Sequence, residues 1–412
     1  MALFDRLIIA AKSQVAYSRI QQVFRYMSTI IKDKGDNNVP LQSPIKKSVF
    51  VSQSMDIFTN LAWEDWFYRN YDFSNHHVLL LWRNDPCVVY GRHQNPWKEC
   101  NVQAAEKRGI ALARRNSGGG TVYHDNGNLN LSFFTPRERY NRKYNLHIIT
   151  RALFREWCLK SVVNERDDIV VEGNYKISGS AAKLGRPNAY HHCTLLVDAN
   201  KNNLRSALEC KENNILTNAT TSTRSPIKNL IDINSDIEMD KLITVIGREY
   251  LRTNAFILED EGHELSQQQM EYQFIDPTEH LFTGLDKLTS EFRSWDWNFG
   301  KTPKFTVNRA LEVIKVKSSV SLRAKLGVLD DADEDTLCRM IYLTLHVEVQ
   351  KGIVEKVTIN LPDGLVSTDF EQDANVINNF CGARYNHEIL EKIIDAISYK
   401  TVTPSTLQSK AA

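Results

Sequence analysis

Three consecutive glycines, at positions 118–120, lie between two arginines and a segment that alternates like a β-strand. Glycine is used where the backbone must take unusual dihedral angles or pass very close to another group, and ordering it carries a high entropic cost. Arg114 and Arg115, with the free N–H groups of such a loop, are a common means of holding an anion. The run therefore predicts either an anion-binding loop or, more simply, a tight turn that enters a strand.

The segments around the glycine run favour an α+β fold with a mixed sheet. In residues 128–134, leucine and phenylalanine alternate with asparagine and serine, which is typical of a half-buried strand. The other segments with a clear pattern are strands at 78–82, 86–91 and 189–199, a short helix running into a strand over 102–115, an amphipathic helix at 144–162, and a hairpin at 168–185 with its turn at Glu172, Gly173 and Asn174. Because helices and strands interleave irregularly, a regular βαβ series is not expected.

Composition limits the kind of protein this is. The chain has 412 residues, which suits two domains, and its formal net charge is +1, so no overall field directs it to nucleic acid. The apolar run at 78–82 is far shorter than the roughly 20 residues needed to span a membrane. Seven scattered cysteines without a CxxC pair argue against a disulfide scaffold or a structural zinc site and indicate a reducing compartment.

The chain divides into four predicted parts. Residues 1–32 are basic, amphipathic and contain one acid, which is typical of a mitochondrial transit peptide, although an ordinary surface helix is the alternative. Residues 33–48 are polar with prolines and predict a linker. We expect a catalytic domain over 49–285 and a smaller α+β accessory domain over 286–412, joined by the aromatic-rich hinge at 294–305.

Two strand segments carry residues suited to chemistry. Lys176, Ser178 and Ser180 alternate, so they are expected on one face as a seat for an anion or carboxylate, although most strand lysines simply face solvent. In the other segment, His191 and Cys193 share a face and His192 takes the opposite one.

Two further pairs leave alternatives open. Cys193 is either a nucleophile activated by a neighbouring histidine or a small packed core residue. His124 and Asp125 are either a general-base pair or a turn that braces the glycine loop. Adjacent residues cannot both reach one ion, so no metal site is predicted at the His191–Cys193 trio.

Six sequence blocks follow one another along the chain and carry a resemblance to a known family: NPWKECN, RRNSGGGTVYHDNGN, KISGSA, AYHHCTLL, STRSPIKNL and SWDWNFGKTPKF. The sequence from about residue 55 to 400 resembles the lipoate–protein ligases and mitochondrial lipoyltransferases. The resemblance implies an α+β, mixed-sheet catalytic domain of the biotin/lipoate protein ligase type. It also implies that a glycine-rich loop wraps the lipoyl tail, and that the segment Thr217 to Asn229 covers the nucleotide.

The resemblance also implies site residues and partners. Lys176 would be catalytic, with Cys193 as a second candidate. The residues expected to bind lipoyl adenylate are Arg115, Ser117, Gly118, Gly119, Gly120, Thr121, Val122, Tyr123, Lys176 and His191. The acceptors would be lipoyl domains of the E2 subunits of 2-oxoacid dehydrogenases, and the glycine cleavage H protein is a possible donor or acceptor. We expect a monomer in the mitochondrial matrix, without nucleic-acid or membrane partners.

Three positions depart from the bacterial ligases and bear on the donor. Asn116, Thr121 and Cys193 stand where those ligases commonly have Ser, Ala and Gly. Thr121 and Cys193 resemble the animal lipoyltransferase branch, which implies transfer of a lipoyl or octanoyl group from lipoyl adenylate or a lipoylated carrier protein. Mg²⁺ would be needed only if the chain also activates lipoate with ATP. A complete ATP-dependent ligase and a non-catalytic lipoyl-domain binding protein are the alternatives.

Overall fold

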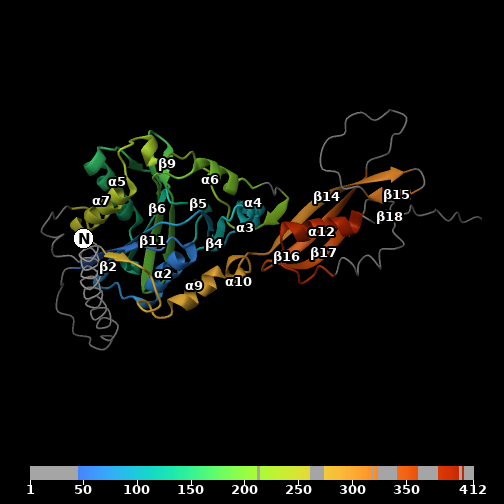
Figure 1. Ribbon diagram of the computed structural model, residues 1–412, viewed down its shortest axis with the longest axis horizontal. Coiled ribbons are helices and arrows are strands. Elements are labelled where there is room, and N and C mark those ends of the chain that lie inside the picture. Colours follow the sequence, from blue (N-terminus) through green and yellow to red (C-terminus); the bar gives the residue numbers. More distant parts are fainter. Residues whose placement is uncertain are drawn as a thin grey trace, which may run out of the picture.

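The structure is a computed structural model that describes residues 45–210, 214–259, 273–316, 319–322, 341–360, 379–398 and 401–402. The predicted transit peptide and residues 33–44 of the predicted linker lie outside the described residues. Figure 1 shows a larger body, in which helices flank a central sheet, and a smaller body built on a second sheet. Helices α9 (Leu285–Arg293) and α10 (Trp295–Asn298) run from the first body toward the second.

The central sheet of the larger body has six strands and is mixed, as the sequence predicts. Its order is β10 (Ser180–Leu184), β11 (Asn188–Leu196), β6 (Asn128–Pro136), β2 (His76–Trp82), β1 (Lys46–Ser52) and β13 (Gln273–Ile275). Neighbours from β10 to β2 are antiparallel, whereas β2, β1 and β13 are parallel. Strands that lie far apart in the sequence are therefore neighbours in the sheet.

Helices cover both faces of this sheet. Helices α5 (Arg142–Trp157) and α7 (Met239–Arg252) pack on one face, and α2 (Ile57–Asn70) and α9 pack on the other. The prediction that residues 128–134 form a half-buried strand was therefore wrong, since this part of β6 is buried throughout. Its polar side is covered by α2, where Ser132 donates a hydrogen bond to Glu64.

Two small sheets complete the larger body. One has the order β4 (Ala111–Arg114), β3 (Cys87–Tyr90), β5 (Val122–His124) and packs with the short helices α4 (Val102–Lys107) and α6 (Lys201–Leu208). Trp97 of the short helix α3 (Pro96–Glu99) packs instead in the core of the smaller body. The other is β7 (Val162–Val163), β8 (Ile169–Val171), β9 (Tyr175–Ser178). The predicted hairpin turn joins β8 to β9, and Glu172 and Gly173 take the positive φ values of 47° and 91° that a tight turn requires. Two 3₁₀ turns, Arg137–Arg139 and Leu230–Asp232, lie in connections.

The smaller body is the predicted C-terminal α+β unit. Its sheet contains β17 (Ile353–Asn360), β16 (Ile341–Gln350), β14 (Phe305–Val316), β15 (Ser319–Leu322) and β18 (Thr401–Val402) in that order, and α12 (His387–Ser398) packs on it. A sixth strand, β12 (Ile215–Thr217), pairs with β14 although it precedes it by about ninety residues. Besides the hinge, the pairing of β12 with β14 and the packing of Trp97 against Phe305 and Tyr385 therefore connect the two bodies.

The boundaries of the two bodies differ from the predicted ones. Residues 46–48 belong to β1 rather than to a linker, and Lys47 is buried with its ammonium donating to the carbonyls of Tyr250 and Thr253 at the end of α7. Residues 286–298 belong to the larger body, because Phe292 and Trp297 lie in its core. The smaller body begins near Phe305.

Candidate functional site

The glycine loop is shaped by Arg115. Its guanidinium donates hydrogen bonds to the carbonyl oxygens of Val89, Gly118 and Gly120, at 2.6–3.1 Å. Burial lowers the pKa of Arg115 to about 10, so the group stays charged near neutral pH. A buried cation surrounded by carbonyl oxygens fixes the path of the loop. The sequence predicted an anion contact for this side chain; in the structure its bonds hold the loop itself.

The glycines at 119 and 120 answer two different steric demands. Gly119 has φ of +89°, and a Cβ there would lie 2.9 Å from Nη2 of Arg115. Gly120 runs so close to Ser222 that a Cβ would lie 3.0 Å from its Oγ. The loop thus needs glycine both for a left-handed conformation and for a close backbone approach.

A long segment crosses the glycine loop and reaches Lys176. Ser222 accepts the N–H of Thr121 at 2.8 Å, and the hydroxyl of Thr121 donates to Gln94 at 2.9 Å. Farther along the same segment, Ile227 forms a parallel bridge with Lys176. Residues 217–229, predicted to cover a nucleotide, therefore connect the glycine loop to the strand that carries the lysine.

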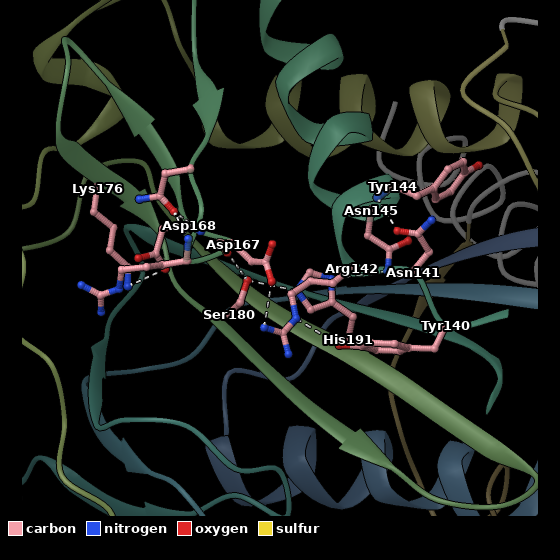
Figure 2. Close-up of polar contacts among 12 residues, drawn as sticks. Tyr140, Asn141, Arg142, Tyr144, Asn145, Asp167, Asp168, Lys176, Ser180 and His191 are labelled. Carbon is pink, nitrogen blue, oxygen red and sulfur yellow. Dashed lines mark hydrogen bonds and ion pairs between the residues drawn. The ribbon is translucent and has the colours of Figure 1, made fainter. Parts of the chain in front are cut away.

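Lys176 lies on β9 with a carboxylate beside it. Its Nζ is 2.8 Å from Oδ1 of Asp168, and their side chains are 22% and 8% exposed. Figure 2 shows the two side chains pointing toward one another, at the end of a row of polar residues from β10, β11 and α5. Asp168 is not among the predicted site residues, although the adjacent acids at 167 and 168 directly before a hydrophobic strand were a usable signal.

The predicted row of Lys176, Ser178 and Ser180 on one face is interrupted. The register between β8 and β9 shifts between Ile169 and Val170, so the alternation does not continue through β9. Ser180 begins the next strand and its hydroxyl donates to the carbonyl of Asp167 at 2.9 Å. Ser178 is fully buried, and its Oγ has no hydrogen-bond partner within the described residues.

His191 and Cys193 share a face of β11, as predicted, but it is the face turned toward α5. On β10, Ser180 bonds His191 on that side, whereas the neighbouring Ala181 lies against Gly119 on the other side. The structure thus separates the side chains of His191 and Cys193 from the glycine loop by the sheet itself. The side chain of His192, which lies between them in the sequence, projects to the loop side.

The thiol of Cys193 is an inert core group in this structure. It is fully buried in the cluster under α5 and α7, and burial raises its pKa. A reactive cysteine needs a low pKa and an exposed sulfur. The geometry therefore favours the packed core residue over the nucleophile.

Asp125 braces the chain after the glycine loop. Its carboxylate accepts the backbone N–H groups of Gly127 and Asn200, the latter at the start of α6. His124 is buried, and burial holds its pKa well below the ordinary range. These contacts favour the bracing turn over a general-base pair.

Two acids on α2, which are not among the predicted site residues, form a buried polar layer on the loop side of the sheet. Glu64 and Asp65 are each 1% exposed. Glu64 accepts a hydrogen bond from His192 at 2.8 Å. Asp65 pairs with Lys183 at 2.9 Å and also accepts a hydrogen bond from the side-chain amide of Asn116. The signal in the sequence was the pair of acids between Trp63 and Trp66, two large apolar residues of the same helix.

The remaining predicted binding residues contribute in different ways. Ser117 is buried at the start of the loop, and its carbonyl accepts the N–H of Arg92. Val122 and Tyr123 pair with β3, and the ring of Tyr123 packs in the core beneath α6. Burial raises the pKa of Tyr123 to about 12. A ligand contact at Tyr123 would therefore involve the backbone.

Comparison with known proteins gives the family. A model described as the lipoyl protein ligase A/B catalytic domain matches residues 56–251. The mitochondrial lipoyl amidotransferase LIPT1 of Mus musculus is 35% identical, over 83% of this chain and 83% of its own length. Lipoate-protein ligase A of Psychrobacter cryohalolentis is 33% identical, over 76% of this chain and 83% of its own. The chain therefore belongs to the family of lipoyl protein ligases and lipoyltransferases.

A solved structure agrees with the predicted fold. The crystal structure of P. falciparum LipL1 in complex with lipoate overlays on 85% of this chain and 94% of its own, with a TM-score of 0.52 and 24% identity. This likeness and the mixed central sheet confirm the predicted fold. Among the described residues, no helix has the length and apolar character that crossing a membrane requires.

Proposed function

We propose that this chain transfers a lipoyl or octanoyl group from an activated donor to a specific lysine of lipoyl domains. The observation that carries the proposal is the position of Lys176, a partly buried cation bridged to the segment that crosses the glycine loop. An acyl adenylate is a mixed anhydride, and its transfer to an amine expels AMP. A cation between the carbonyl and phosphate oxygens would stabilise the charge that grows on both.

The proposed seat for the donor consists of Arg115, residues 117–123 and Lys176. Arg115 would act mainly by fixing the loop, since its guanidinium already bonds three carbonyl oxygens. The polar layer formed by Glu64, Asp65 and His192 lies on the same side of the sheet.

The donor is proposed to be lipoyl adenylate or a lipoylated carrier protein. Thr121, which departs from the bacterial ligases, is engaged with both Gln94 and Ser222 at the crossing. Asp168 is already paired with Lys176, so a role in binding Mg²⁺ would require that pair to open. The alternative is the complete ATP-dependent ligase reaction, and the relatives named lipoate–protein ligase are the reason to retain it.

The proposed acceptors are lipoyl domains of 2-oxoacid dehydrogenase E2 subunits, with the glycine cleavage H protein as donor or acceptor. The enzyme is proposed to work as a monomer in the mitochondrial matrix. The relatives that are named mitochondrial support the organelle. Import into isolated mitochondria checks the location. The mature chain should begin near Ser28 to Val39, and an uncut chain starting at Met1 would count against a transit peptide.

The direct experiment incubates the purified chain with an apo lipoyl domain and lipoyl adenylate and measures the mass of the domain. Transfer adds one lipoyl unit to the lysine. A chain that binds the domain but never changes its mass would be a non-catalytic binding protein.

A further inference from the structure

The Lys176 ammonium pairs with Asp168, and the turn that carries Asp168 is held in place by contacts with α5 and β10. We infer that Arg142, Asp167 and Ser180 are positioning residues that set the place of the Lys176 ammonium by shaping the turn that carries Asp168. The inference rests on the proposed function of Lys176. The side chains of Arg142 and Ser180 contact Asp167, and Asp167 directly precedes Asp168, so their effect on Lys176 passes through Asp168 (Figure 2).

The turn between β7 and β8 has a shape that needs external support. Asn164 accepts the N–H groups of Arg166 and Asp168 with its side chain, each at 3.0 Å. Within this turn Asp167 has φ of +58°, a left-handed conformation that L-residues rarely adopt. Asp168 follows directly, so its direction toward Lys176 depends on that backbone.

Two contacts hold Asp167 from neighbouring elements. Nη1 of Arg142, in the first turn of α5, lies 3.3 Å from its carboxylate. The hydroxyl of Ser180, at the start of β10, donates to its carbonyl at 2.9 Å. Arg142 thus contacts the side chain of Asp167, and Ser180 contacts its backbone; these two contacts are the anchors of the turn.

His191 completes the anchor at Ser180. Because the hydroxyl of Ser180 donates to Asp167, Nε2 of His191, 3.1 Å away, acts as the donor to Ser180. Nδ1 then accepts from the amide of Asn145 at 3.4 Å. Burial holds the pKa of His191 well below the ordinary range, consistent with a neutral ring. In this tautomer His191 cannot take a proton from Ser180, so the pair is a support and not an activated nucleophile.

The geometry has a consequence for transfer. An ammonium has three N–H donors, and the Asp168 carboxylate uses one, which leaves two for the acyl and phosphate oxygens. A displacement of about 1 Å at such a group can cost roughly 100-fold in rate. Weakening either anchor should therefore lower kcat while the donor still binds.

The test compares Arg142→Gln, Asp167→Asn and Ser180→Ala with the control Arg151→Gln. Arg151 lies on the same helix and pairs with Glu249 instead. Asparagine tolerates the left-handed conformation, so Asp167→Asn removes the charge without straining the turn. We expect kcat for transfer from lipoyl adenylate to fall about tenfold in the three variants, with KM nearly unchanged and with the control at the wild-type rate. Arg142→Lys should restore part of the loss.

A second readout does not depend on transfer. The amine of Lys176 is labelled with an amine-reactive ester and quantified by mass spectrometry against Lys392, which is paired within α12 of the smaller body. Labelling of Lys176 should rise severalfold in the three variants and stay at the wild-type level in Arg151→Gln. Unchanged labelling and unchanged kcat in the three variants would overturn the inference. If the wild type itself transfers nothing, the proposed function fails, while the labelling still decides whether these residues position Lys176.

Discussion

Lys176 lies on β9 with 22% of its side chain exposed, paired to Asp168 and bridged to residue 227. Replacing it with alanine removes the cation but little packing, so Lys176→Ala should keep a circular dichroism spectrum near wild type. Its melting temperature should fall moderately, because the nearly buried Asp168 carboxylate loses its partner. Transfer should fall by about 10²–10³, the usual effect of losing one electrostatic donor to the transition state. Substantial remaining turnover from lipoyl adenylate would place the anion seat elsewhere.

Cys193 gives a prediction of the opposite kind. If the transfer from a lipoylated carrier protein passed through a thioester, the thiol would have to ionise, which burial opposes. Cys193→Ala should therefore transfer from lipoyl adenylate and from a carrier protein at rates near wild type, with a loss of about 1 kcal/mol in unfolding free energy. Loss of transfer from the carrier protein alone would restore the covalent relay.

The residue types at the site could be predicted from the sequence, but the face of the sheet that borders the glycine loop could not. Alternation along residues 190–194 placed His191 and His192 on opposite faces, and the structure confirms it. Which face borders the glycine loop depends on the pairing of β10 with β11 and on the backbone contact of Gly118 with Ala182. The contact of Gly118 with Ala182 joins segments 64 residues apart (182 minus 118), and no local pattern reports it.

Strand β2 carries two histidines that stay neutral in the folded protein. Burial, with Lys46 nearby, lowers the pKa of His76 to about 4 from its ordinary value of 6.5. Between these values the unfolded chain binds a proton that the folded chain does not, so stability is present above pH 6.5 and is lost as the pH falls. The slope for this group approaches about 1.4 kcal/mol per pH unit.

Urea unfolding at several pH values between 7 and 4.5 measures this dependence. His77 on the same strand, whose pKa burial lowers to about 3, adds to the slope. His76→Gln should flatten the curve relative to wild type, even if its stability at pH 7 is lower. An unchanged slope in that variant would assign the pH dependence to other groups.

At the level of elements, periodicity predicted which segments form helices and strands better than it predicted what covers each face of them. The helix at α5, the hairpin turn at Glu172–Asn174 and the strand at β11 were all found. Strand β6 looked half-buried because its polar residues alternate with apolar ones, yet α2 covers the polar side. A covered polar face is visible only when both layers are known, because a buried polar layer and a solvated one leave the same alternation.

At the scale of the whole molecule, the hinge belongs to the larger body. Arg114 donates to the carbonyls of Trp297 and Asn298, and Asn298 accepts the backbone N–H of Arg114. The predicted boundary lies between residues 285 and 286, but these contacts across about 180 residues lie beyond sequence patterns.

Two truncations test this boundary. A chain ending at residue 285 loses Phe292 and Trp297 from the core, each worth about 3–5 kcal/mol by comparison with core truncations. A chain ending at residue 302 keeps both, together with Thr302, which accepts from Arg114. Thermal unfolding should give a clearly lower melting temperature for the shorter chain. Equal melting temperatures would return the boundary to residue 285.

The measurement that tests the central claim most directly is the mass of an apo lipoyl domain after incubation with the purified chain and one of two donors. With lipoyl adenylate, the domain should gain one lipoyl unit, and Lys176→Ala should abolish the gain. With lipoate, ATP and Mg²⁺, little product should form. Robust product from lipoate and ATP would show a complete ligase, and a domain whose mass does not change with either donor would contradict the claim that this chain is a lipoyltransferase.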